Sequence, residues 1–509
     1  MVKYIKPTLT KNGLEIKVQE LKDKFGEKGY KSLLRKFTIR FKSPVGTYYI
    51  EKKIYKFSKS KELLFLPRFS TNALLASGII SNPINNIPTG EKLTHKFIGE
   101  PTHNQLTVAN FIMNNIFSLD NRDKGLAGCT ICMLAGGGKT FLAMYMISLL
   151  EKKTLIIVPN TYLLQQWREL LSEFIPTAKI GVYYGKEKKD GDIVVGIVNS
   201  LSKEKIINPN NKKEEISTSE YCNKFGFVVL DESHIYCTES FSSIYKNIQS
   251  GYMLGLSATP CEREDGTDKI SHLNIGEVIY CKDIEGYVSE DNKFESDVKV
   301  VKYAGPSEYS ENKILDSNGM ISVPLMLEDL VNDPYRNKLI LDNILELLEE
   351  HEMNLFVFSD RRAHCELLEN MLIENLKSKS NVSINSIISD DEKIELACTM
   401  YGGCKEDIID KAKYSASIIF TTYAYSSTGV SIDKLNGLVL ATPRKSKARQ
   451  ILGRIFRNKK EFLHKKRKII DICDINSCLK QQLYKRLSAY KERNSTIAYE
   501  TVRFEDIEL

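Results

Sequence analysis

The sequence holds 509 residues, enough for about three domains, since a domain commonly takes about 150 residues. Hydrophobic residues make up 42% of it, which allows sizeable cores and excludes a chain that is disordered throughout. It contains no run of about 18 uncharged apolar residues, so we expect a soluble intracellular protein with no membrane partner. Eleven cysteines at irregular spacings favour reduced thiols over a disulfide framework.

The formal net charge of +7 is unevenly distributed along the chain. Residues 1–60 hold sixteen Lys or Arg against five Asp or Glu, and residues 444–468 hold twelve against one. Such concentration favours a polyanionic partner, touched at two places. The alternative for the first segment is a lysine-rich surface that only keeps the protein in solution.

Short β-like stretches, "KFTIRFK" and "GTYYIEKKIYKF", lie within residues 1–95, which close with the Pro- and Asn-rich link "NPINNIPTGEK". We therefore expect a small basic α+β domain there, which binds nucleic acid or a protein partner. Tyr48, Tyr49, Tyr55 and Phe57 lie among its basic residues. They would stack on bases or, equally simply, fill the core of this domain.

Beyond the first 95 residues, short apolar stretches alternate with helical patterns, which is typical of parallel sheets flanked by helices. The alternation runs over 96–285, is interrupted by a polar stretch at 286–333 and restarts over 334–480. The expected fold class is α/β, with two tandem lobes joined by a linker. Residues 481–509 are expected to form a helical tail.

The stretch "MLAGGGKT" differs from the glycine-rich phosphate loop, G-x-x-x-x-G-K-[ST], only at Met133, which takes the place of the first glycine. It follows a strand pattern and precedes a helical one, as that loop requires. The glycines would let backbone N–H groups approach phosphates, the lysine would pair with phosphate oxygens, and the threonine hydroxyl would bind Mg²⁺. The residues expected to bind ATP here are Gly136, Gly137, Gly138, Lys139 and Thr140.

A second motif, "FVVLDESH", ends an apolar strand pattern with Asp231 and Glu232. Buried strands normally avoid carboxylates, so a functional role is expected for this pair. We expect Asp231 to hold Mg²⁺ and Glu232 to polarise the hydrolytic water, as catalytic residues. The alternative is a capping Asp-Glu pair at a strand-to-helix turn. His234 belongs to the same motif and is expected to act in coupling, with a neutral imidazole at pH 7.

The strand pattern "LGLSATP" ends in two hydroxyl residues, Ser257 and Thr259. Their side chains would hydrogen-bond back to the acidic motif and so couple phosphate chemistry to the rest of the molecule. The alternative is an ordinary strand end. The nearby "CTIC" is expected to be a pair of buried thiols, because no second Cys/His pair has the spacing of a metal site.

Near the second basic segment, "QILGRIFR" has the period of a helix. Gln450 and Arg454 are four residues apart, and Arg457 follows three residues later, so all three are expected on one helix face as catalytic residues. Arginines presented to a nucleotide stabilise charge on the transferring phosphoryl group. The alternative is a solvated basic face.

These motifs together resemble those of the superfamily 2 helicases. In order, they are "LAGGGKT" (I), "LIIVPNTYLLQQW" (Ia), "DESH" (II), "SATP" (III), "LFVFSD" (IV), "TTYAYSSTGVSID" (V) and "QILGRIFR" (VI), within residues 100–475. The resemblance implies two RecA-like lobes, with ATP bound between them and nucleic acid across both. It further implies ATP contacts by Gln105, Gly429 and Asp433, and nucleic-acid contacts by Arg263, Glu264, Asp265, Thr421 and Thr422.

Within that superfamily, the Arg-Glu-Asp element after "SATP" is similar to the XPB-like branch of DNA translocases. That branch tends to have a bulky apolar residue at the position of Met133. The chain most resembles the poxvirus-type transcript-release DNA helicase and its relatives in other large cytoplasmic DNA viruses, the asfarvirus member above all. Upstream, "PTHNQ" matches the adenine-binding element at Gln105, whereas Thr102 stands where the family has an arginine.

The resemblance implies a monomeric, nucleic-acid-stimulated ATPase with ATP and Mg²⁺ as cofactors. It would move in the 3′ to 5′ direction on DNA or DNA/RNA hybrids and meet the viral transcription machinery in the host cytoplasm or in the virion. Two alternatives stay open. One is an RNA helicase of the DEAH-like type, and the other is a nucleic-acid clamp that uses ATP as a switch without unwinding.

Overall fold

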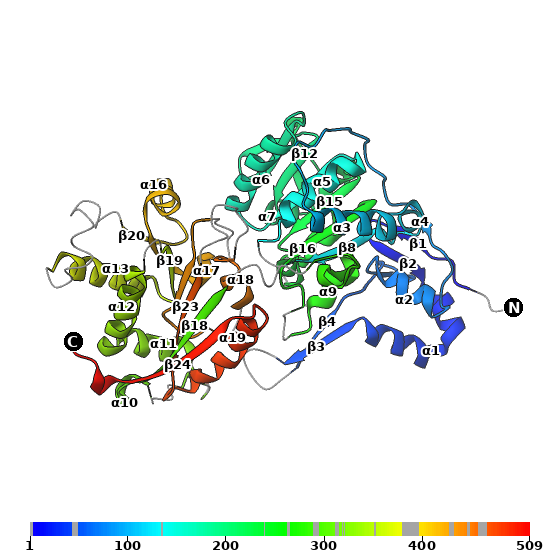
Figure 1. The fold of residues 1–509 in the computed structure, drawn as a ribbon. Coiled ribbons are helices and arrows are strands. Elements are labelled where there is room, and N and C mark those ends of the chain that lie inside the picture. The colour runs from blue at the N-terminus through cyan, green and yellow to red at the C-terminus, as the bar shows by residue number, and fades with distance from the viewer. Residues whose placement is uncertain are drawn as a thin grey trace. The chain divides into compact units, whose positions relative to one another are not determined.

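The computed structural model describes residues 4–42, 49–133, 136–238, 240–261, 265–288, 295–310, 315–317, 319, 321–350, 353–378, 396–426, 432–444, 448–456 and 466–509. The chain forms two compact units, one made of Met1–Leu134 with Gly138–Val288 and the other of Ala135–Gly137 with Ser289–Leu509. Figure 1 shows helices packed against the sheets of each unit. In the described part of the chain, no helix combines the length and the apolar character needed to cross a membrane.

The first 95 residues form a five-stranded sheet with helices at its side. Its strand order is β5-β6-β2-β1-β7. Leu9, Leu14 and Leu64 are fully buried in its core. A separate two-stranded ribbon pairs β3 with β4. The elements are β1 (Thr8–Thr10), β2 (Gly13–Lys17), α1 (Val18–Lys36), β3 (Thr38–Lys42), β4 (Tyr49–Lys53), β5 (Lys56–Phe57), β6 (Leu63–Leu66), α2 (Ser70–Ala76) and β7 (Ile84–Asn85).

This N-terminal region packs directly on the following lobe of the same unit. The buried guanidinium of Arg68 donates hydrogen bonds to the backbone carbonyls of Gly125, Ser250 and Gly251, the first at 2.6 Å and the last at 3.0 Å. Burial lowers the pKa of Arg68 to about 9. The N–H of Phe69 also donates to the Leu273 carbonyl of α9 (Asp268–Ile275) at 2.9 Å. These contacts join the two parts into one compact body.

The lobe in residues 96–288 is built on an eight-stranded sheet with the order β11-β10-β12-β9-β15-β16-β8-β17. Its pairs are parallel except that of β10 with β11. The strands are β8 (Gly128–Cys132), β9 (Thr154–Val158), β10 (Ile180–Tyr184), β11 (Glu187–Lys189), β12 (Ile193–Ile197), β15 (Phe227–Asp231), β16 (Tyr252–Ser257) and β17 (Glu277–Tyr280), and β13 (Lys205–Asn208) with β14 (Asn211–Ser217) forms a hairpin.

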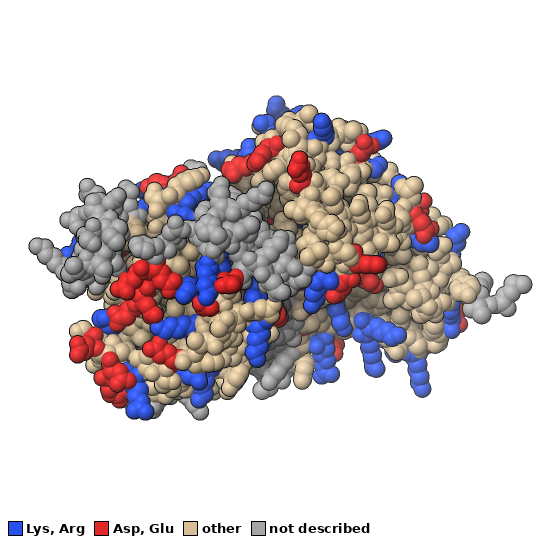
Figure 2. All heavy atoms as spheres, viewed as in Figure 1, with Lys and Arg blue, Asp and Glu red and all other residues tan. Residues whose placement is uncertain are grey.

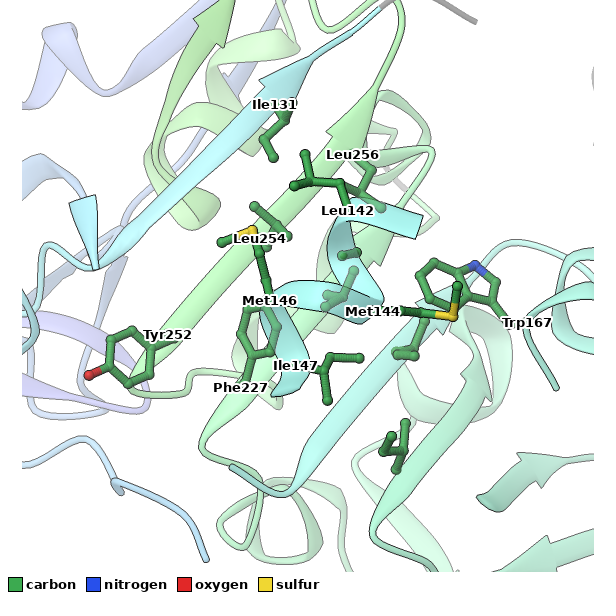
Figure 3. Packing of buried hydrophobic residues seen from close by; sticks show 14 of the residues in the cluster. Ile131, Leu142, Met144, Met146, Ile147, Trp167, Phe227, Tyr252, Leu254 and Leu256 are labelled. Atoms are coloured by element: carbon green, nitrogen blue, oxygen red, sulfur yellow. The ribbon is translucent and has the colours of Figure 1, made fainter. Parts of the chain in front are cut away.

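Helices cover this sheet because their apolar faces pack on its buried strands. Figure 3 shows Met144 and Met146 of α5 with Trp167 of α6 and Phe227 of β15 in one core. All four side chains are at most 1% exposed. The helices are α3 (His103–Phe111), α4 (Leu119–Asp123), α5 (Lys139–Leu150), α6 (Thr161–Phe174), α7 (Val198–Leu201), α8 (Thr218–Cys222) and α9 (Asp268–Ile275), with 3-10 turns η2 (Ser233–Cys237) and η3 (Ser242–Lys246).

The second unit is built on a seven-stranded parallel sheet with the order β20-β21-β19-β22-β23-β18-β24. Its strands are β18 (Ser296–Ala304), β19 (Leu355–Ser359), β20 (Ala397–Met400), β21 (Ile418–Thr422), β22 (Gly437–Leu440), β23 (Arg467–Asp474) and β24 (Thr496–Arg503). Its helices are α10 (Ser307–Ser310), α11 (Val323–Asn332), α12 (Pro334–Glu349), α13 (Arg362–Lys377), α16 (Glu406–Asp410), α17 (Tyr423–Ser426), α18 (Ala448–Leu452) and α19 (Gln482–Lys491).

Two stretches differ from the sequence-based expectation. Part of the expected linker, 286–333, is β18, an inner strand of this sheet. The expected helical tail, 481–509, holds α19 and also β24, which pairs with β18 over its whole length. Lysines alternate with buried valines in β18, and this polarity conceals the strand in the sequence.

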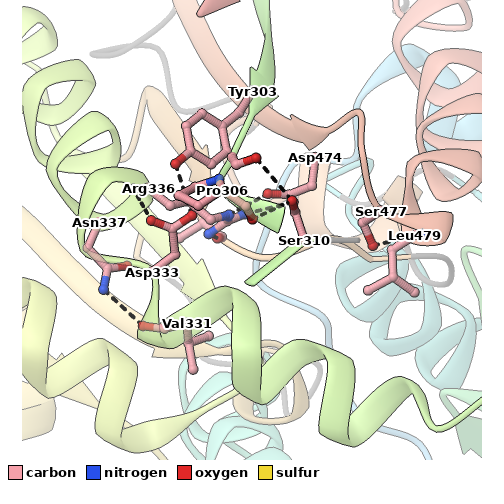
Figure 4. Close-up of polar contacts among 12 residues, drawn as sticks. Tyr303, Pro306, Ser310, Val331, Asp333, Arg336, Asn337, Asp474, Ser477 and Leu479 are labelled. Atoms are coloured by element: carbon pink, nitrogen blue, oxygen red, sulfur yellow. Dashed lines mark hydrogen bonds and ion pairs between the residues drawn. The ribbon is translucent and has the colours of Figure 1, made fainter. Parts of the chain in front are cut away.

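A buried polar network joins α12 to the sheet of this unit, as Figure 4 shows. Arg336 is fully buried and pairs with Asp474 through two hydrogen bonds of 2.6 and 3.1 Å. Asp333 caps α12 by accepting from the Arg336 N–H and also accepts from the Tyr303 hydroxyl at 2.9 Å. Every charge in the group is therefore met by a partner, as burial requires.

Candidate nucleotide-binding and hydrolysis site

The phosphate loop, the acidic motif and the "SATP" motif meet at one edge of the first unit's large sheet. β15, β16 and β8 are adjacent parallel strands. In their registers Asp231 is paired with Leu256, and Ser257 is paired with Cys132. Because the carboxyl ends of parallel strands lie at the same edge, the three motifs that follow these strands are neighbours. Ligands of open α/β sheets bind at this edge.

The loop between β8 and α5 has the backbone of a phosphate cradle. Gly136 and Gly138 have φ angles of 89° and 81°, which only glycine adopts without strain. A Cβ atom on Gly138 would lie 2.3 Å from Nε2 of Gln105, so a larger residue would displace the end of that side chain. Lys139 begins α5, and its Nζ donates to the Met133 carbonyl at 3.0 Å. The ammonium is thereby held inside the loop.

Met133 is 2% exposed and its N–H donates to the Ser257 carbonyl at 3.3 Å. The residue that departs from the textual glycine pattern is thus a buried extension of β8. It packs in the core rather than lining the loop. The glycines needed for the close backbone approach are the later ones.

Gln105 is tied to this loop from the preceding helix. Its Nε2 donates to the Gly138 carbonyl at 3.4 Å, and its Oε1 accepts from the Thr102 N–H at 2.8 Å. The Thr102 hydroxyl in turn accepts from the Gln105 N–H at 3.3 Å, which completes a capping box at the start of α3. Thr102, at the position of the family's arginine, is therefore a helix cap here. Gln105 positions the phosphate loop.

Asp231 is 6% exposed and has both carboxylate oxygens engaged. Its Oδ2 accepts from the indole Nε1 of Trp167 at 2.8 Å, and its Oδ1 accepts from the Glu232 N–H at 2.9 Å. Burial, followed by the charge of Glu232, raises the pKa of Asp231 to about 6. Burial lowers the pKa of Lys139, and the charges of Glu232 and Asp231 oppose that effect.

Glu232 turns the chain sharply after β15, with a left-handed φ of 51°. Such a conformation is uncommon for a residue with a side chain and clusters at functional sites. Its buried Oε2 accepts no hydrogen bond from the residues that the structure describes, and it lies 3.3 Å from Nδ1 of His234. That nitrogen is 3.1 Å from the Ser257 hydroxyl, which also accepts from the Thr259 N–H at 3.0 Å. The acidic motif and the "SATP" motif are thus in direct contact.

The chemistry of these groups fits a magnesium nucleotide. Carboxylate and hydroxyl oxygens, as on Asp231 and Thr140, are the ligands that Mg²⁺ prefers. Thr140 lies in the first turn of α5, whose N-terminal amide groups favour phosphate. The orphaned Oε2 of Glu232 calls for a hydrogen-bond donor, and a water molecule at the site would supply one.

The residues after "SATP" are partly described. Asp265 accepts from the N–H of Thr267 at 3.0 Å and from its hydroxyl at 2.6 Å, so it stabilises the turn before α9. Arg263 and Glu264 lie outside the described residues. A nucleic-acid contact by this element stays a prediction.

In the second unit, Thr421 and Thr422 end β21, and both are buried. Thr421 Oγ1 has no hydrogen-bond partner among the described residues. Asp433 is half-buried before β22. Gly429 and Arg457 lie outside the described residues. The roles expected for these residues stay predictions.

The prediction that Gln450 and Arg454 share a helix is wrong. α18 ends at Leu452, and the N–H of Arg454 bonds to the Ile451 carbonyl at 3.0 Å in a tighter turn. Gly453 lies at this point, and glycine is a poor helix former that favours helix ends. Gln450 is in the helix, whereas Arg454 follows it.

Trp167 was not among the predicted site residues. It is the only tryptophan of the chain and is the last residue of motif Ia, within α6. A buried indole N–H usually needs a hydrogen-bond acceptor. That rule is the signal from which a polar partner of Trp167 could have been predicted.

Comparisons with known proteins indicate the family to which the chain belongs. The family described as "Type III restriction enzyme, res subunit" matches residues 99–262. The protein named "Putative ATP-dependent RNA helicase QP509L" of African swine fever virus (isolate Pig/Kenya/KEN-50/1950) is 30% identical over 381 residues, which are 71% of this chain and 68% of the relative. "Putative ATP-dependent RNA helicase L396" of Acanthamoeba polyphaga mimivirus is 29% identical, over 73% of this chain and 65% of the relative.

Among solved structures, a fragment of a putative HsdR subunit of a type I restriction enzyme from Vibrio vulnificus YJ016 has a TM-score of 0.52 at 15% identity. It covers 96% of this chain and 84% of its own, and it shows the fold alone. The chain belongs to the superfamily 2 helicases, a class of nucleic-acid-stimulated ATPases with RecA-like lobes. Within that class it is similar to viral ATP-dependent helicases.

Proposed function

We propose that this helicase uses ATP hydrolysis at the edge of β8, β15 and β16 to move along DNA or a DNA/RNA hybrid. The observation that carries the proposal is the convergence of Lys139, Asp231 and Glu232 at that edge, with the His234 contact to Ser257 beside them. A loop that binds phosphate, a carboxylate for a metal and a carboxylate for water are the parts that phosphoryl transfer needs.

The roles follow from the geometry of each side chain. Lys139 and the first amides of α5 bind the β- and γ-phosphates, and Gln105 holds the loop in its phosphate-binding shape. Thr140 and Asp231 hold Mg²⁺, which supplies Lewis-acid charge at the phosphates. Glu232 orients the attacking water and accepts its proton at Oε2, an atom that accepts no hydrogen bond within the described part of the chain.

His234 links hydrolysis to the rest of the lobe. Its Nδ1 lies between Glu232 Oε2 and the Ser257 hydroxyl, at 3.3 and 3.1 Å. A change at the γ-phosphate that moves Glu232 therefore reaches the end of β16 through one imidazole. Thr259, bonded to Ser257, carries the displacement into the segment that follows.

The second unit would complete the site as the family resemblance implies. We propose that Arg454 and Arg457 stabilise the transferring phosphoryl group and that Gln450 orients the water. Gly429 and Asp433 would contact the nucleotide. Thr421, Thr422 and the element Arg263, Glu264 and Asp265 would contact nucleic acid.

The Arg-Glu-Asp element, which is similar to that of the XPB-like branch of DNA translocases, supports DNA or a DNA/RNA hybrid as the polymer. The same resemblance supports 3′ to 5′ movement and a role in viral transcription. RNA is a second candidate, because the viral relatives are named as RNA helicases. A clamp that uses ATP without unwinding is the third. All three candidate functions use the same nucleotide site. They differ in which nucleic acid is bound and in whether its strands are separated.

The test is the ATPase rate of the full chain without polymer, with single-stranded DNA and with RNA, followed by strand displacement. Displacement substrates are a DNA duplex, a DNA/RNA hybrid and an RNA duplex, each with a 3′ or a 5′ tail. We expect stimulation by DNA and displacement of 3′-tailed DNA or hybrid. Stimulation by RNA alone would establish the second candidate, and stimulation without displacement would establish the clamp.

A further inference from the structure

A cavity of about 250 Å³ lies where the N-terminal region meets the lobe of residues 96–288. Five lysines line it, and no aspartate or glutamate is among its described lining residues. Four lysines come from the N-terminal region and one from η3 of the lobe. They are Lys11, Lys52, Lys53, Lys56 and Lys246.

Two of these lysines line the cavity from the two parts that meet at the junction. Lys56 belongs to β5, and Lys246 ends η3. Desolvation first, and then the charge and the contact of Lys246, lower the pKa of Lys56 to about 8. Both residues nevertheless stay solvent-accessible. Two ammonium groups in contact repel each other, so the arrangement is stabilised when an anion lies between them.

The basic surface of the same N-terminal region adds to this preference. Figure 2 shows Lys and Arg side chains gathered over α1 and near the β3–β4 ribbon, as these are placed in Figure 1. A concave site lined by one sign of charge concentrates the field and raises the local concentration of counter-ions. The cavity volume of about 250 Å³ is several times the volume of one water, about 30 Å³. The cavity therefore has room for a phosphate with an attached group.

We propose that this junction cavity is a phosphate-binding site, separate from the nucleotide site. Lysine ammonium groups bind phosphate oxygens as point charges. The Lys56 and Lys246 pair would contact the phosphate directly, and Lys11 would add charge at its rim. The phosphate is either one group of a polynucleotide backbone or that of a small phosphorylated molecule. The first source rests on the proposed function, whereas the second does not.

The first measurement is acylation of lysines in the full chain at pH 8, quantified by mass spectrometry. Lys56 should react at least threefold faster than Lys59, because a lowered pKa leaves more of its amine unprotonated. Pyrophosphate or a 20-nucleotide single-stranded DNA should then slow acylation of Lys56 at least threefold and leave Lys59 unchanged. Since pyrophosphate also suits the phosphate loop, the experiment is repeated in Lys139→Ala.

The second measurement uses a charge-matched pair of variants. Lys56→Gln with Lys246→Gln removes the pair, and Lys36→Gln with Lys59→Gln removes two exposed lysines that do not line the cavity. For single-stranded DNA, log K falls with log[salt] by about 0.7 per phosphate contact. The slope of log K against log[salt] should flatten by about 0.7 in the variant that lacks Lys56 and Lys246. The control variant should keep the wild-type slope. Both variants should keep the wild-type ATPase rate without polymer.

The outcomes separate the two sources. If DNA slows acylation of Lys56 and the salt-dependence slope is flatter in the variant that lacks Lys56 and Lys246, the phosphate belongs to a polynucleotide backbone. Protection by pyrophosphate alone, with an unchanged slope, identifies a small phosphorylated ligand and leaves the site in place even if the chain acts on no polymer. Equal acylation of Lys56 with and without both probes, in the wild type and in Lys139→Ala, would overturn the proposal.

Discussion

The indole Nε1 of Trp167 donates a 2.8 Å hydrogen bond to Oδ2 of Asp231, and this bond lowers the pKa of the carboxyl against the stronger effect of burial. The only tryptophan of the chain therefore reports on the carboxylate that is proposed to hold Mg²⁺. This relationship gives the metal site both an optical probe and a defined dependence on pH.

Replacing Trp167 by Phe should raise the pKa of Asp231 above its value of about 6, because a hydrogen bond that favours the ionised form is lost. Asp231 must be ionised to bind the metal, so activity is present above this pKa and is lost as pH falls through it. We expect the Mg²⁺ concentration for half-maximal ATPase to increase several-fold at pH 6 and to approach the wild-type value at pH 8.5. An equal loss at every pH would mean that Trp167 acts only by packing.

Lys139→Ala and Glu232→Gln should separate binding from hydrolysis. Lys139→Ala removes the phosphate-binding ammonium, so ATP affinity and turnover should both fall. Glu232→Gln keeps the shape but cannot accept a proton, so ATP should bind nearly normally while kcat falls at least 100-fold, about 2.7 kcal/mol. Nucleotide affinity by equilibrium dialysis and single-turnover rates are the measurements. Wild-type hydrolysis by Glu232→Gln would show that the acidic motif has been assigned wrongly.

Arg454→Ala should abolish the polymer-stimulated part of ATP hydrolysis and leave ATP binding largely intact. The reason is that a transition-state contact affects kcat and not ground-state affinity. Arg449→Ala is the matched control, because Arg449 lies on α18 and pairs with Glu492 at 2.7 Å. The ratio of rates with and without single-stranded DNA is measured for both. Stimulation that survives in Arg454→Ala contradicts the proposed role.

Arg68→Met should loosen the N-terminal region from its lobe. Three backbone carbonyls lose their donor, and each buried unsatisfied group costs about 1–3 kcal/mol. We expect a lower urea midpoint and faster proteolysis within residues 1–95. Arg40→Met is the control, since Arg40 is exposed and stacks on Tyr49 at 4.6 Å. Equal protease resistance of the two variants would show that the junction does not depend on this guanidinium.

The convergence of the phosphate loop, the acidic motif and the "SATP" motif at one sheet edge was predictable from the sequence, because each motif directly follows a short buried strand. Asp231 and Glu232 follow a run of apolar residues, and parallel strands bring such ends together. The Trp167 bond was not predictable in this way, since it joins residues 64 apart and depends on how α6 packs on β15. The pairing of Gln105 with Gly138 was missed for the same reason.

Errors arose where local pattern and tertiary context disagree. The helical period of "QILGRIFR" extends past Gly453, but the helix ends before it. In β18, Lys299 forms ion pairs with Glu346 and Glu500 and Lys302 lies over the Tyr499 ring, while the valines of the strand are buried. Such a strand has the composition of a surface loop, and only its neighbours in the sheet make it an inner strand.

The position of β18 between β23 and β24 has a consequence for synthesis on the ribosome. The first strand of the second unit cannot complete its backbone hydrogen bonds until the chain has emerged through Arg503, whereas the contacts of the first unit lie within residues that emerge earlier. Both edges of β18 lack partners until β23 emerges, and one edge stays open until β24 follows. Exposed strand edges are sites of aggregation. The lysines on β18 would then oppose aggregation of the nascent chain, before Lys299 forms its ion pairs in the folded protein.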